Sequence, residues 1–223
     1  MFYQARSPYI ALIWLLAAVF IAAATPRADA DLAIQGGSQA QQQLLRQIFT
    51  SRIPAPLRQG ATLFVNILTD RQMNAYIHYG NSAHMSSNDA ADAIDGIFED
   101  GPPTITLRGA TDQCALPFTF VHEFGHFFWQ NGLTKTDRSR YGEVYSKQKR
   151  AHSLITEYAA TDVHEGFAEA FSYYILSKTT LRHRDPLSCA YLDNVFGRVG
   201  NASQPVVRVS QHVSSKLYAS PGG

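Results

Sequence analysis

The stretch from Leu116 to Asn131 is apolar around most of a helix, rather than along a single stripe. A helix that is apolar on nearly all sides is typical of the interior of a domain. Pro117 suits its first turn, and Asn131-Gly132 is expected to end it with a residue that tolerates a positive φ. The pattern therefore predicts a buried helix over 116–131.

Two further segments have apolar residues at helical spacing. Residues 40–50 predict a short amphipathic helix that packs on the core. A second stripe predicts another helix in the C-terminal half. Its members are Phe167, Ala170, Phe171, Tyr174 and Ile175. Residues 135–150 are polar and basic between these regions, and we interpret them as a solvated crossover segment.

Three segments have the pattern of β-strands. Residues 61–68 are rich in β-branched and aromatic residues, and residues 75–79 and 104–108 alternate between apolar and polar positions. Residues 31–39 are small and polar, so we expect a loose start to the mature chain. Together the patterns predict an α+β fold, in which a small twisted sheet packs on the helix over 116–131 and a mainly helical C-terminal half follows.

The first 30 residues differ in composition from the rest of the chain. Arg6 lies near the start, residues 9–24 carry no charge, and a small-x-small sequence ends at Ala30. This order predicts a secretory signal peptide that is cleaved after Ala30, and hence an extracellular or periplasmic location. An uncleaved anchor is the alternative, although the apolar run is shorter than the roughly 20 residues of a membrane span.

The charge balance argues against two classes of partner. The chain carries 19 basic and 18 acidic residues. Loss of residues 1–30 would remove Arg6, Arg27 and Asp29 and leave 17 of each sign. A neutral chain has no electrostatic basis for binding nucleic acid or an anionic membrane surface. We expect a monomer with neither kind of partner.

The two cysteines, Cys114 and Cys189, leave the redox state open. In an exported chain they could form one disulfide, and two buried free thiols fit the sequence equally well. Cys114 also precedes His122 by eight positions, where it could serve as a metal ligand.

Residues 122–126 of the predicted buried helix read H-E-F-G-H, a match to H-E-x-x-H. Side chains four apart share one face of a helix, so His122 and His126 would direct two imidazoles at one zinc ion. Glu123 would flank the ion and act as general base for a water molecule. The alternative is a pair of core histidines that form hydrogen bonds with backbone or carboxylate groups.

A catalytic zinc usually has three protein ligands, so one more must come from elsewhere in the chain. Glu165 and Glu169 lie four positions apart in the second helical segment, where two carboxylates need a positive partner. Glu165 could instead cap the helix, because Asp162 and Glu165 resemble a capping box. Asp162 and His164 are alternative ligands beside it.

With these motifs in this order, residues 100–180 resemble the catalytic domain of anthrax lethal factor and the secreted bacterial Pro-Pro endopeptidases, which are gluzincin metallopeptidases. The resemblance implies that Glu165 is the third zinc ligand. It implies that Glu169 holds a ligating histidine in place. It also implies that Tyr158, seven positions before Glu165, donates a hydrogen bond to the oxyanion of the tetrahedral intermediate.

The resemblance also implies a fold and a reaction. Residues 31–223 would form a single zincin-like metallopeptidase domain with one Zn²⁺. The strand over 104–108 would border the cleft and pair with an extended peptide, unless it is an ordinary sheet edge. We therefore predict a secreted zinc-dependent endopeptidase that acts on a protein or peptide. The alternatives are a non-catalytic extracellular zinc-binding or adhesion module, and a metallohydrolase that acts on a non-protein amide.

Overall fold

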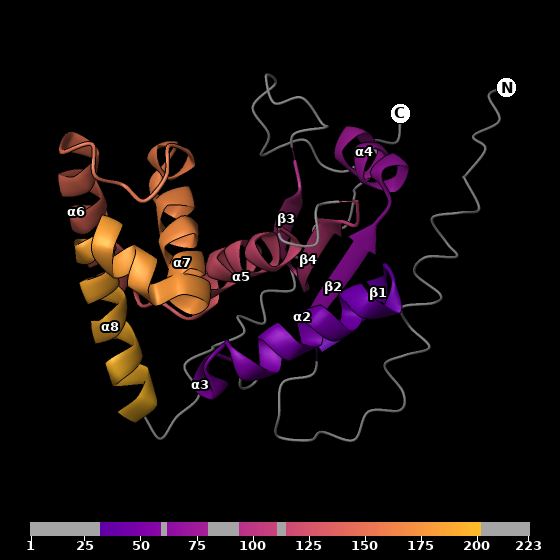
Figure 1. The fold of residues 1–223 in the computed structure, drawn as a ribbon, viewed down its shortest axis with the longest axis horizontal. Coiled ribbons are helices and arrows are strands. Elements are labelled where there is room, and N and C mark those ends of the chain that lie inside the picture. The colour runs from indigo at the N-terminus through magenta and orange to yellow at the C-terminus, as the bar shows by residue number, and fades with distance from the viewer. Residues whose placement is uncertain (1–31, 59–61, 80–93, 111–114, 202–223) are drawn as a thin grey trace, which may run out of the picture.

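A computed structural model describes residues 32–58, 62–79, 94–110 and 115–201. In chain order the elements are β1 (Leu32–Gly36), α2 (Gln39–Ser51), α3 (Ala55–Arg58), β2 (Leu63–Leu68), α4 (Asp70–Tyr79), β3 (Gly96–Asp100), β4 (Pro103–Arg108), α5 (Leu116–Asn131), α6 (Lys135–Arg150), η3 (Tyr158–Ala160), α7 (Val163–Arg184) and α8 (Pro186–Asn201). Figure 1 shows α5 between the sheet and the group formed by α6, α7 and α8. The predicted α+β class, with a small sheet and a mainly helical C-terminal half, is confirmed.

The described strands form one sheet in the order β1-β2-β4-β3. β1, β2 and β4 are mutually parallel, and β3 runs antiparallel to β4. The predicted strands over 61–68 and 104–108 correspond to β2 and β4. Val65 lies opposite Ile105 and is fully buried with it, so the centre of the sheet contributes directly to the core.

The two faces of the sheet carry different helices. Phe98 of β3 meets Phe127 of α5, with ring centroids 5.9 Å apart. On β4, the Arg108 guanidinium lies 3.2 Å from an Asp70 carboxylate oxygen of α4. Because successive side chains of a strand point to opposite faces, Ile105, the partner of Phe98, lies on the α5 face and Arg108 on the α4 face. The sheet thereby fixes α5 against β3 and β4.

The predicted buried helix is confirmed, since α5 spans Leu116–Asn131 with Pro117 in its first turn. It ends without a positive φ, because Gly132 has φ −99° and its N–H donates to the Phe128 carbonyl. The predicted helix over 40–50 lies within α2, and the second predicted stripe lies on α7, where Phe167 and Phe171 are fully buried.

The strand predicted over 75–79 is wrong, because these residues are the second half of α4. Thr69 and Gln72 start this helix: the Gln72 side chain accepts from the Thr69 N–H at 3.0 Å, and the Thr69 hydroxyl accepts from the Gln72 N–H at 3.4 Å. Met73 and Ile77, four positions apart, are its buried residues. A five-residue alternation was too short to separate a strand from one face of a helix.

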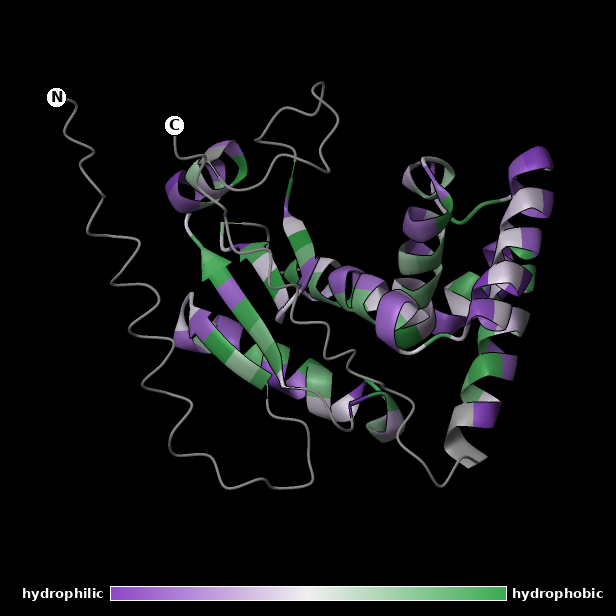
Figure 2. Cartoon of the chain, turned by 180° about the vertical axis from the view of Figure 1, so that it is seen from behind, coloured by the Kyte–Doolittle hydropathy of each residue, from purple (hydrophilic) through white to green (hydrophobic). Residues whose placement is uncertain are grey.

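The solvated crossover predicted over 135–150 is also wrong, because these residues form α6. Thr134 and Asp137 make a capping box at its start. Tyr141, Tyr145 and Gln148 form its buried stripe, at spacings of four and three residues. The rest of the helix is largely hydrophilic, as Figure 2 shows, and a stripe this narrow was hidden among its charged residues.

The loose start predicted for residues 31–39 is wrong for the described residues 32–39, because β1 occupies Leu32–Gly36 and pairs in parallel with β2. Leu32 is buried opposite Leu63. β1 forms by pairing with a strand about thirty residues away in the sequence, so the composition of residues 32–36 alone could not predict this strand.

The edge predicted for 104–108 is wrong as well. β4 lies between β2 and β3, and β3, which the sequence did not predict, lies at the end of the described sheet. β3 and β4 are joined through a turn at Gly101-Pro102.

Several predictions on the termini and cysteines fall partly outside the described residues. The signal segment 1–30 and Cys114 lie outside them. Cys189 is a buried free thiol in α8. Within the described ranges, no helix has the length and apolar character needed to cross a membrane.

Candidate metal centre

Helices α5 and α7 approach each other closely at a glycine. A Cβ atom on Gly125 would lie 2.9 Å from the Cα and 3.3 Å from the Cβ of Ala168, and the first distance is shorter than real Cβ contacts allow. Only a residue without a side chain fits between the two helices here. This contact lies between the histidines of α5 and the carboxylates of α7, and it sets how near they come.

Three predicted ligands meet where the helices approach. The ligand atoms of His122, His126 and Glu165 all lie within 4.8 Å of one another. His122 Nε2 lies 2.9 Å from Glu165 Oε2 and 3.1 Å from His126 Nε2. His126 Nε2 lies 3.4 Å from the same Glu165 oxygen. Two imidazole nitrogens and one carboxylate oxygen therefore form a small triangle.

The size of this triangle fits a zinc ion. Bonds of about 2.0–2.1 Å in a tetrahedral site place neighbouring ligand atoms about 3.3–3.4 Å apart. The three observed separations, 2.9, 3.1 and 3.4 Å, are within a few tenths of an ångström of that value. Nitrogen and carboxylate donors are also the ligands that zinc takes in catalytic sites. The cluster thus has the donor set and dimensions to hold a metal ion.

Glu169 fixes the orientation of the His122 ring. The His122 Nδ1–H donates to Glu169 Oε1 at 3.1 Å, and the Thr156 hydroxyl donates to Glu169 Oε2 at 2.8 Å. When a metal displaces the proton on Nε2, the proton on Nδ1 stays with Glu169, and the Nε2 lone pair is directed to the side of His126 and Glu165. A carboxylate behind a ligating histidine commonly has this role.

The electrostatics of the cluster favour positive charge. Burial on its own lowers the pKa of His122, but hydrogen bonds to Glu165 and Glu169 outweigh it and raise the pKa to about 10. Burial opposes ionisation of Glu165, yet hydrogen bonds to His122 and His126 lower the pKa of its carboxyl well below the ordinary value. The space between the three ligands therefore stabilises a cation.

Glu123 lies on the side of α5 that faces the sheet. It is buried and accepts a hydrogen bond from the Phe98 backbone of β3. A Cβ on Gly96, two residues before Phe98 in β3, would lie 2.8 Å from Glu123 Oε1. The absence of a side chain at Gly96 therefore provides the space that the carboxylate occupies. Burial raises the pKa of Glu123, and the electrostatic influence of the nearby His122 and His126 imidazoles opposes that rise. A carboxylate with a raised pKa is suited to general-base chemistry near neutral pH.

Tyr158 lies over the cluster from η3. Its ring centroid is 5.8 Å from that of His122, and the residue is 57% exposed. Partial burial raises the pKa of its phenol, and the carboxylates of Glu165 and Glu123 raise it further. The phenol therefore keeps its proton at neutral pH and can donate a hydrogen bond.

The alternative ligands lie outside the cluster. The Asp162 side chain is the N-cap of α7 and accepts from the backbone N–H groups of His164 and Glu165, at 2.6 and 3.1 Å. The His164 ring packs edge-on against Trp129, with centroids 5.1 Å apart. The Glu165 carboxylate is directed to the two histidines of α5 instead of back to the helix start.

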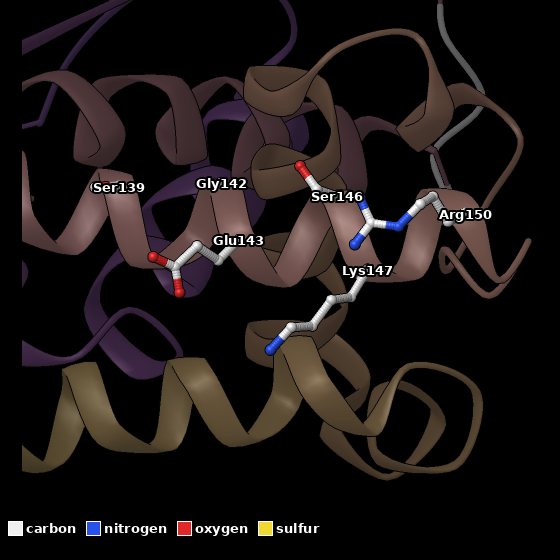
Figure 3. A pocket seen from close by; sticks show the side chains of 6 residues that line it. All are labelled: Ser139, Gly142, Glu143, Ser146, Lys147 and Arg150. Atoms are coloured by element: carbon white, nitrogen blue, oxygen red, sulfur yellow. The ribbon is translucent and has the colours of Figure 1, made fainter.

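A surface hollow on α6 is separate from this site. Figure 3 shows its lining side chains along one side of the helix: Ser139, Gly142, Glu143, Ser146, Lys147 and Arg150. None of these residues belongs to the cluster of His122, His126 and Glu165.

Three residues that shape the site were not predicted from the sequence. Gly125 carried a signal, because a glycine inside a helix is costly and usually marks a close contact. Gly96 and Thr156 carried none, since the groups they touch, on Glu123 and Glu169, are distant in the sequence.

The comparisons with known proteins do not assign the chain to a family. No family model matches it, and no curated protein does. Among solved structures, the chain is similar to a Pro-Pro endopeptidase from Paenibacillus alvei, with 15% sequence identity and a TM-score of 0.49. The match covers 74% of this chain and 97% of that chain. A likeness at this level of identity and TM-score does not establish the family of the chain.

Proposed function

We propose that the chain is a zinc-dependent endopeptidase, exported through a signal peptide at residues 1–30. The observation that carries the proposal is the triangle of His122, His126 and Glu165, with separations that suit one zinc ion. These three residues would hold the ion. Once bound, zinc supplies Lewis-acid activation of a water molecule and of the scissile carbonyl.

Glu123 is the general base of this proposal. It follows His122 directly on α5 and has a raised pKa. Its carboxylate takes the proton of the attacking water and delivers that proton to the leaving amine. Burial keeps bulk water from competing for the carboxylate.

Tyr158 is the hydrogen-bond donor to the oxyanion. Its phenol stays protonated beside Glu165, and its exposure leaves it accessible to a substrate. A single donor of this kind typically contributes about 100-fold or more to the rate.

The substrate strand would lie along β3. This strand ends the described sheet, and its Phe98 backbone contacts the proposed base. A peptide in extended conformation can add to such an edge through main-chain hydrogen bonds, which do not depend on the identity of its side chains. A single domain over 31–223 that acts as a monomer would suffice for this reaction.

Zinc analysis combined with a peptide library tests the proposal. The purified protein should bind one zinc per chain and cleave internal peptide bonds, and removal of zinc by a chelator should abolish cleavage. The Glu123→Gln variant is the matched control, because it should retain zinc and lose turnover. A protein that binds zinc but cleaves no peptide would favour the adhesion module or the non-protein amide hydrolase. Undiminished cleavage by Glu123→Gln would show that the base is another group.

A further inference from the structure

Thr156 uses both hydrogen-bonding capacities of its hydroxyl. Oγ1 accepts from the Ala159 backbone N–H at 3.0 Å and donates to Glu169 Oε2 at 2.8 Å. The direction of these bonds is unambiguous. A backbone N–H can only donate and an ionised carboxylate can only accept, so the hydroxyl accepts from Ala159 and donates its proton to Glu169. Thr156 thus joins the short helix η3 to the interior of α7.

The connection continues to the metal cluster. Glu169 accepts from Thr156 with one oxygen and from the His122 Nδ1–H with the other, at 3.1 Å. An unbroken chain of hydrogen bonds therefore runs from the η3 backbone, through Thr156 and Glu169, to the ring of a proposed ligand. Tyr158, directly before Ala159, lies at the same end of this chain.

Helix α6 holds η3 from its other end. The Tyr145 hydroxyl and the Lys149 ammonium both donate to the Ala160 carbonyl, at 3.2 and 2.8 Å. These two bonds hold η3 against α6 but do not reach the cluster. The bond from Ala159 to Thr156 connects the η3 backbone, through Glu169, to the rear of the His122 ring, a route separate from the direct contact of Tyr158 with that ring.

We propose that Thr156 is a positioning residue that couples the placement of Tyr158 to the orientation of His122. This inference rests on the proposed function, since it assigns the two ends of the hydrogen-bond chain to zinc binding and to oxyanion stabilisation. The plainer role of Thr156, a local cap for η3, would need only its acceptor oxygen. The donated bond to Glu169 is what extends its effect to the metal cluster.

The comparison of Thr156→Val with Thr156→Ser tests this inference. Valine has the shape of threonine without the hydroxyl, whereas serine keeps both hydrogen bonds. For Thr156→Val we expect zinc affinity to fall about 10- to 100-fold, as for other partners of metal ligands. The Ala159 amide should exchange its hydrogen faster. Thr156→Ser should remain within about twofold of wild type in affinity. Thr136→Val, at an exposed threonine of α6, is the matched control.

A double-mutant cycle tests the coupling to Tyr158. With zinc at saturation, Thr156→Val should lower kcat in the wild-type background and have much less effect when Tyr158 is already phenylalanine. Zinc affinity within twofold of wild type in Thr156→Val, or additive effects on kcat, would overturn the inference. If valine prevents folding, Thr156→Ala takes its place in the same measurements.

The outcome is separable from that of the proposed function. Zinc affinity and Ala159 exchange report on Thr156 even in a protein that cleaves no peptide. Failure of the wild-type protein to bind zinc would refute the proposed function, and with it the assignment of Thr156.

Discussion

The substitution Gly125→Ala tests whether the close approach of α5 and α7 creates the metal site. The added Cβ would lie 2.9 Å from Ala168 Cα, whereas carbon atoms in contact are about 3.5–4.0 Å apart. Because the clashing atom belongs to the backbone, no rotamer change relieves the contact. α7 must therefore retreat by about 1 Å, at a cost of about 1–3 kcal/mol in the free energy of unfolding.

The same retreat would open the ligand triangle. A movement of about 1 Å, fully transmitted, takes the separation of His122 Nε2 and Glu165 Oε2 from 2.9 Å to about 3.9 Å. That exceeds the roughly 3.3–3.4 Å edge of a tetrahedral zinc site. We therefore expect at least a 100-fold loss of zinc affinity, which is about 2.7 kcal/mol. The substitution itself leaves the side chains of His122, His126 and Glu169 chemically unchanged.

Competition with a chromogenic chelator gives the zinc affinity, and thermal unfolding with and without zinc gives an independent value. Zinc at 1,000 times its Kd stabilises a protein by about 4 kcal/mol, and this gain should shrink in Gly125→Ala. Gly197→Ala is the control, because a Cβ there meets nothing within 4 Å. A folded Gly125→Ala protein with zinc affinity within twofold of wild type would refute the reasoning.

Three further predictions concern single residues. Tyr158→Phe should lower kcat on a good peptide substrate about 100-fold and leave zinc affinity unchanged. A loss of zinc affinity in the same variant would instead indicate a structural role for Tyr158. Gly96→Ala should lower kcat more than zinc affinity, because the new Cβ would lie 2.8 Å from Glu123 Oε1. Gly101→Ala is the control, since a Cβ there meets open space and should leave kcat unchanged. Equal kcat values for the two variants would contradict the proposed role of Glu123. Asp185→Asn should change the pH dependence of Tm. Burial raises the pKa of Asp185, and within the described residues its Oδ2 has no hydrogen-bond partner. Because the folded-state pKa exceeds the unfolded value of about 3.9, the stability of wild type relative to Asp185→Asn is greatest below that value and decreases as pH rises through the folded pKa. A value of Tm for wild type minus Tm for Asp185→Asn that stays constant or grows from pH 3 to pH 7 would contradict this prediction.

The parts of the fold that were predicted have strong local patterns. α5 is apolar on nearly all sides, and β2 is a run of β-branched and aromatic residues, so each element is determined by its own segment. β1 and α6 were missed for the opposite reason. β1 forms because Leu32 and its neighbours pair with a strand that is distant in the sequence. The buried residues of α6 form a narrow stripe, which can be recognised as core only when α7 and α8 are known to pack beside it.

The candidate site shows the same division. The spacing of His122 and His126 is a property of one helix, so the sequence alone brings both rings to one side. The place of Glu165 beside them depends on how α7 crosses α5, and only the resemblance to a family implied it. The contacts of Thr156 and Gly96 follow from tertiary packing that no local pattern records.

A crystal structure of the zinc-loaded protein, with the ion located by anomalous scattering, tests the central claim most directly. The account predicts His122 Nε2 and His126 Nε2 at about 2.0–2.1 Å from the ion and a Glu165 oxygen at about 2.0–2.2 Å. An ion with both Glu165 oxygens beyond about 3 Å, or with Asp162 or His164 in place of Glu165, would contradict it.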